Sequence, residues 1–146
     1  MTRSIAISVA AFALVIALGA QAQTAKWDQA AVTAAAADYE AAVSGLRDAV
    51  RKSTAWTTSA NKSRLYQISQ DLRKIEWLAQ SLHGDLVKGD GLEATTPEYN
   101  EILENREYAK SDAMFVDISD FIKPKLEASR AALAKLAAFY PAQPKL

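Results

Sequence analysis

The strongest constraint on this chain is an apolar pattern in its middle, where aliphatic side chains recur every three or four residues for six consecutive steps. The positions are Leu65, Ile68, Leu72, Ile75, Ala79, Leu82 and Leu86. Spacings of three and four place side chains on one face of an α-helix, whereas a half-buried strand alternates every two residues. The pattern predicts a long amphipathic helix that ends near Lys88, with Leu72, Ile75 and Leu82 in the core.

Similar patterns predict helices on both sides of this one. The first is expected over residues 24–52, with an apolar face made of Val32, Ala36, Tyr39, Val43, Leu46 and Val50. A later helix is expected to begin at Thr96-Pro97-Glu98, because a threonine cap, an early proline and an acidic first turn are typical of helix starts. Helical spacing then continues through Tyr99, Ile102, Arg106, Ala109, Ala113 and Val116, and from Phe115 through Ile118, Ile122, Leu126, Leu133, Leu136 and Tyr140.

The fold class follows from the number of these segments. Sustained two-residue alternation is missing, so no strand is predicted. Four amphipathic segments with short connections predict an all-α protein, an antiparallel four-helix bundle. Pro124 lies inside the last apolar pattern, and proline kinks or breaks a helix. The alternative is therefore a three-helix bundle with a long third helix that passes Ser111 and kinks at Pro124.

The first 22 residues have the order of a secretory signal peptide. Arg3 is followed by an uncharged apolar run over residues 5–18, and Ala20 and Ala22 supply the small residues of a cleavage site. The run is shorter than the roughly 20 residues that a transmembrane helix needs. We expect cleavage after Ala22, which leaves a single domain, residues 23–146, in the periplasm or outside the cell.

Composition excludes several classes of function. The chain has no cysteine, which removes a lipoprotein anchor, thiolate metal sites and c-type haem attachment. The expected mature domain carries a net charge of −1 and no polybasic cluster, so neither nucleic acid nor a membrane surface is an expected partner. Phosphate-binding glycine loops and the nucleophile elbow of serine hydrolases are also missing, and we expect no enzymatic activity.

Two side chains are weak candidates for binding haem or a metal ion. His83 and Met114 are the only histidine and the only methionine of the expected mature chain. Both types ligate iron and copper. The plainer interpretation is that His83 is a boundary residue near a helix end and that Met114 fills space in the core. We therefore expect no cofactor.

One aromatic residue departs from the pattern. With Leu65 at the first heptad position, Trp77 points away from the apolar face, and Tyr66 and Arg73 lie on an adjacent outer column. We expect the Trp77 ring to be covered by another helix or by residues 89–96. The alternative is a partner-binding surface, since Trp, Tyr and Arg are enriched at interface hot spots. Trp27 and Trp56 are candidates for the same surface.

Two functions remain after these exclusions. The first is an exported helical bundle that binds a protein partner in the cell envelope, as an immunity, adaptor or chaperone-like protein. The second is a carrier of a small ligand, haem or metal, with its site in or at the end of the bundle.

Overall fold

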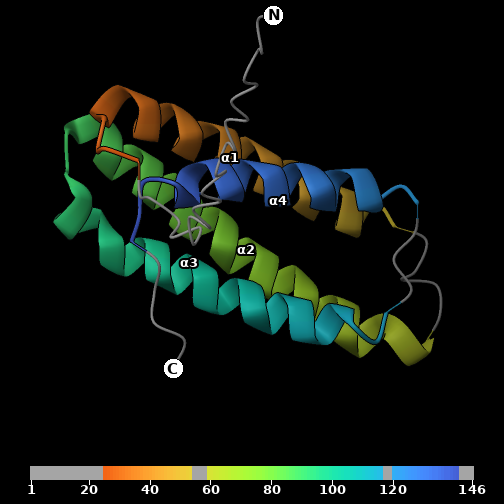
Figure 1. Ribbon diagram of the computed structural model, residues 1–146. Coiled ribbons are helices and arrows are strands. Elements are labelled where there is room, and N and C mark those ends of the chain that lie inside the picture. The colour runs from red at the N-terminus through yellow and green to blue at the C-terminus, as the bar shows by residue number, and fades with distance from the viewer. Residues whose placement is uncertain (1–24, 54–58, 117–119, 142–146) are drawn as a thin grey trace, which may run out of the picture.

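The computed structural model describes residues 25–53, 59–116 and 120–141, and within these ranges it contains four helices and no strand (Figure 1). They are α1 (Gln29–Arg51), α2 (Ser59–Lys88), α3 (Leu92–Ala113) and α4 (Lys123–Ala137). The predicted all-helical bundle is confirmed. The expected signal peptide at 1–22 lies outside the described residues, as do Trp56 and Ile118. None of the described helices combines the length and the apolarity that a membrane crossing requires.

The apolar faces of α1 and α2 are buried as predicted. Every member of both patterns is less than a tenth exposed, including Leu72, Ile75 and Leu82. α1 begins later than expected, because the carboxylate of Asp28 accepts a hydrogen bond from the Ala31 amide at 3.0 Å and caps the helix there. α2 ends at Lys88, as the sequence indicates, and Gly89 follows with a φ of 100°. Positive φ is accessible to glycine at little cost, so Gly89 permits the sharp turn into α3.

The expected start of α3 at Thr96 is wrong. The helix begins at Leu92, after an extended Gly91, and Pro97 lies inside it. The two threonine hydroxyls do not cap: Thr95 donates to the Gly91 carbonyl at 3.0 Å and Thr96 to the Leu92 carbonyl at 2.6 Å. Such bonds back to the preceding turn are the alternative that threonine has inside a helix.

The chain breaks between α3 and α4, so the alternative with one long kinked helix is wrong. α3 passes Ser111 and ends at Ala113, and Pro124 occupies the first turn of α4 rather than a helix interior. Proline is tolerated there because the first amides of a helix have no partner within the helix.

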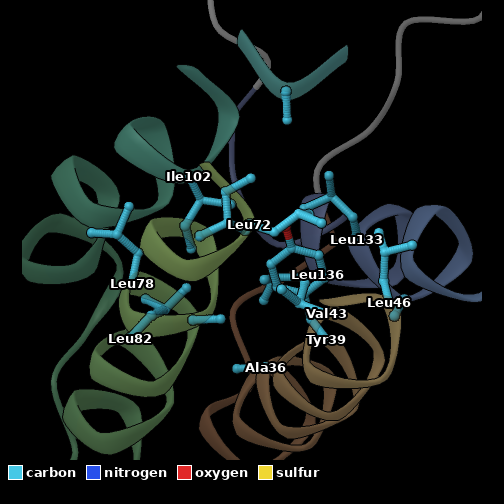
Figure 2. Close-up of a cluster of buried hydrophobic side chains, with 14 of the residues drawn as sticks. Ala36, Tyr39, Val43, Leu46, Leu72, Leu78, Leu82, Ile102, Leu133 and Leu136 are labelled. Atoms are coloured by element: carbon cyan, nitrogen blue, oxygen red, sulfur yellow. The ribbon is translucent and has the colours of Figure 1, made fainter. Parts of the chain in front are cut away.

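The helices are antiparallel neighbours in the order α4, α1, α2, α3. α1 packs closely against both α2 and α4, and α2 against α3, whereas the backbones of α3 and α4 do not approach each other in the described residues. Two polar pairs join α1 to α2, Arg47 with Glu76 and Glu40 with His83. Figure 2 shows side chains of all four helices in one core cluster. The fourth side of the bundle, between α3 and α4, is therefore left to side chains alone.

Aromatic side chains close this fourth side at one end. Tyr140, just after α4, stacks on Tyr99 of α3 with ring centroids 4.1 Å apart and an angle of 8° between the planes. The Tyr140 hydroxyl donates a hydrogen bond to the Thr95 hydroxyl at 3.0 Å. The rings of Trp27 and Tyr140 are nearly perpendicular, with centroids 5.8 Å apart. The opposite end, where α3 ends and α4 begins, has no such closure among the described residues.

Candidate functional site

A cavity of about 320 Å³ occupies the open end of the bundle. All four helices contribute to it, and most of its wall is the apolar face that the sequence predicts. The largest aliphatic residues of that wall are Val43, Leu46 and Val50 of α1, Leu65, Ile68, Leu72 and Ile75 of α2, and Ile122 and Leu126 around the start of α4. The α3 side is lined by the small residues Ala109 and Ala113. The cavity exists because α3 places small side chains where the other helices place large ones.

The polar part of the wall is positively charged. Arg106 and Lys110 of α3 and Arg130 of α4 line the cavity, and among the described residues no carboxylate does. Each cation has a surface partner: Glu107 lies 3.5 Å from Arg106 and 3.0 Å from Lys110, and Glu127 lies 2.8 Å from Arg130. These side chains are about half exposed, and ion pairs of that kind contribute little to stability. The cations are consequently available to an anionic ligand.

Tyr39 forms part of the cavity wall and is neutral. Its side chain is 2% exposed, and burial raises the pKa of its hydroxyl well above the ordinary value. The charge of Arg106, which lines the same cavity, partly opposes this rise in pKa. The hydroxyl therefore keeps its proton across the physiological range.

Exposed apolar side chains surround the outer end of the cavity. Met114, which also lines the cavity, is 75% exposed, the next residue, Phe115, is exposed, and so is Phe121 shortly before α4. The guanidinium of Arg64 lies 4.2 Å from the Phe115 ring centroid, a cation–π contact between α2 and the segment after α3. Side chains of this kind normally avoid water, so their exposure beside a cavity indicates a binding region.

The two weak candidates for metal binding are not brought together. His83 lies near the end of α2 where the chain turns into α3, and its Nδ1 is 2.7 Å from a carboxylate oxygen of Glu40. Met114 follows the end of α3 and lines the cavity together with Leu65, which precedes His83 by 18 residues of α2. At the usual rise per residue this separation is about 27 Å along the helix axis. The described residues hold no group of three or more histidine, cysteine or acidic side chains suited to a metal ion.

The expectation that Trp77 is covered is wrong. Its side chain is 62% exposed, Tyr66 is 60% exposed and Arg73 is exposed beside them on the outer face of α2. α3 packs on a different face of α2, and only three residues join the two helices, so neither the connection nor α3 buries the ring. Trp27 is not part of this surface, because it packs against Tyr140.

The sequence left open a ligand site in or at the end of the bundle, but it did not identify the residues of this cavity, although α3 carries a signal for them. Its helical pattern contains Arg106 and then Ala109 and Ala113, at positions where a core helix normally has large apolar residues. No protein-family model, curated protein or solved structure matches this chain.

Proposed function

We propose that this protein is a non-enzymatic carrier that binds a small, largely apolar ligand in the open end of its bundle. The observation that carries the proposal is the cavity between the four helices. Protein interiors are close-packed, with few voids larger than a water molecule. Ligand sites are typically apolar cavities of about 300 Å³ and above with a few polar groups. The volume and the wall of this cavity match that description.

The experiment measures uptake of a neutral fluorescent probe, N-phenyl-1-naphthylamine, which brightens in apolar sites. The purified protein is expected to bind one probe per chain. Ala113→Phe places a ring in the cavity wall and is expected to reduce uptake at least tenfold. Ala131→Phe is the matched control, since Ala131 is exposed on α4 and does not line the cavity. Equal uptake by both variants, with helix content unchanged, would contradict the proposal.

Export to the periplasm or beyond is part of the same proposal. It is supported by Arg3, the apolar run over residues 5–18 and the small residues at Ala20 and Ala22. N-terminal sequencing of protein from the periplasmic fraction is expected to begin at Gln23. Intact protein recovered from the membrane fraction would refute this part.

A protein partner in the cell envelope is the second candidate function, and the exposure of Trp77 favours it. Tyr66, Arg73 and Trp77 lie on the outer face of α2 and are all exposed, and these residue types are enriched at binding hot spots. An immunity, adaptor or chaperone-like role would use this face. Trp77→Ala is expected to leave stability within about 0.5 kcal/mol of wild type, as exposed substitutions do, and to abolish capture of the partner. Tyr108→Ala, an exposed aromatic change on α3, is the control. Unchanged capture by Trp77→Ala would remove this candidate.

A further inference from the structure

We infer that the ligand is an anionic amphiphile with a single acyl chain of about a dozen carbons. This inference rests on the proposed function, and it names the chemical class that the cavity selects. The evidence is the distribution of charge and apolar surface around the cavity. A neutral apolar ligand requires no cation, yet three cations line the wall, and in the part of the chain that the structure describes their carboxylate partners lie at the surface and not in the wall.

The three cations belong to α3 and α4, the two helices whose backbones stay apart in the described residues. Arg106 and Lys110 are one helical turn apart on α3, so their side chains share a face. Arg130 approaches from α4 on the other side of the cavity. Glu107 pairs with both Arg106 and Lys110, so one carboxylate serves two cations. A carboxylate or phosphate head group placed here would accept charge-assisted hydrogen bonds from the donors of these cations that their glutamate partners do not use.

The apolar wall extends from this head-group position toward the end of the bundle. Arg106 and Tyr39 both line the cavity, and the α1 part of the wall continues from Tyr39 to Val50. Eleven residues of helix span about 16 Å. An extended chain advances about 1.2 Å per bond, since three backbone bonds cover at most about 3.6 Å. The wall therefore accommodates a chain of about 12 to 14 carbons.

The volume gives a similar length. A dry engineered cavity of about 150 Å³ in another protein binds benzene, which has six carbons. The cavity here is about 320 Å³, roughly twice that volume. It therefore holds about twelve carbons. The end of the tail would contact Met114 and Phe115, which are exposed at the outer end of the cavity.

The test compares three ligands with one tail and different heads: dodecanoate, 1-dodecanol and dodecyltrimethylammonium. Each displaces N-phenyl-1-naphthylamine from the purified protein at pH 8, where the carboxylate is ionised. Dodecanoate is expected to bind at least tenfold more tightly than dodecanol, and the ammonium compound most weakly. Dodecyl phosphate is also expected to exceed dodecanol, and the tighter of the two anions identifies the head group. Shortening the acid to octanoate is expected to cost about fourfold per methylene.

Charge variants assign the preference to the named cations. Arg106→Met and Lys110→Met are each expected to weaken dodecanoate severalfold and to leave dodecanol within twofold. Lys135→Met is the matched control, because Lys135 is exposed on α4, pairs with Asp38 at 3.4 Å and does not line the cavity. Added salt is expected to weaken dodecanoate and not dodecanol.

The outcomes separate this inference from the proposed function. If neither the probe nor dodecanol binds, the carrier function fails and the inference fails with it. If dodecanol binds as tightly as dodecanoate, the carrier function stands and the anionic head group is wrong. Native mass spectrometry is expected to show one dodecanoate per chain. A dimer that takes up no ligand would mean that a second copy covers the open end, and it would overturn the inference.

Discussion

Filling the cavity from α3 is expected to stabilise the protein, the opposite of what a large residue does in a packed core. Ala109 is buried, 8% exposed, and lines the cavity. Ala109→Leu adds three carbons, and each buried methylene contributes about 0.8 kcal/mol. Ordering the leucine side chain costs about 0.5–1 kcal/mol. The expected net gain is about 1.5 kcal/mol in the free energy of unfolding.

Ala132→Leu is the matched control. Ala132 is also a helical alanine, 7% exposed, but it lies in α4 away from the cavity wall. We expect the same three carbons to overpack the core there, at a cost of about 1–3 kcal/mol. The helix propensities of the two changes are equal, so the contrast between the variants isolates the empty space.

Urea unfolding at 25 °C, with linear extrapolation to water, measures both variants. The two free energies of unfolding are expected to differ by more than about 2.5 kcal/mol, with wild type between them. Ala109→Leu is also expected to bind N-phenyl-1-naphthylamine less tightly, because the side chain occupies the volume of the probe. Destabilisation of both variants by similar amounts would refute the reasoning, since it would show that Ala109 borders no usable space.

Three further predictions concern stability. Leu72→Ala is expected to lower the free energy of unfolding by about 2–5 kcal/mol, and Gln70→Lys, on the outer face, by less than about 0.5 kcal/mol. Similar losses for the two variants in urea unfolding would contradict the assigned face. Burial raises the pKa of Asp71 above its ordinary 3.8, so the wild-type free energy of unfolding falls as pH rises above that value. Asp71→Asn is expected to remove this fall in the free energy of unfolding, measured by urea unfolding over pH 3–8. If the variant shows the same fall, groups other than Asp71 cause it. Pro97→Ala restores an amide donor to the Glu93 carbonyl. It is expected to raise the free energy of unfolding by up to about 3 kcal/mol, and the melting temperature with it.

α2 was predictable from the sequence because its pattern is long and uninterrupted. Seven apolar positions in register outweigh any single local preference, and the Gly89 turn marks the end. The start of α3 was not predictable from the same signals. A threonine hydroxyl before a proline can accept from an amide and cap a helix, or donate to a carbonyl within one. Thr96 does the second, and the spacing of the residues is the same in both cases.

Trp77 shows that the heptad position was a better guide than the chemistry of the side chain. The pattern placed the ring on the outer face, and the prediction of a cover came from the assumption that a large apolar ring needs one. Folded surfaces contain many apolar atoms, so that assumption is weak for a single residue. What sequence reasoning lacked was the position of α3, which leaves the outer column of α2 open.

The cavity depends on how α3 and α4 face each other, and the pattern of either helix alone does not specify this. The apolar pattern of α3 changes along its length, from the large Tyr99 and Ile102 to Arg106 and then to alanine. Tyr99 meets Tyr140 and closes the bundle at that end. If α3 and α4 also met one helical turn beyond this contact, the guanidinium of Arg106 would be buried between them. A buried charge without a partner is costly. The charge that disfavours contact between α3 and α4 is therefore the same charge that the open end offers to an anionic head group.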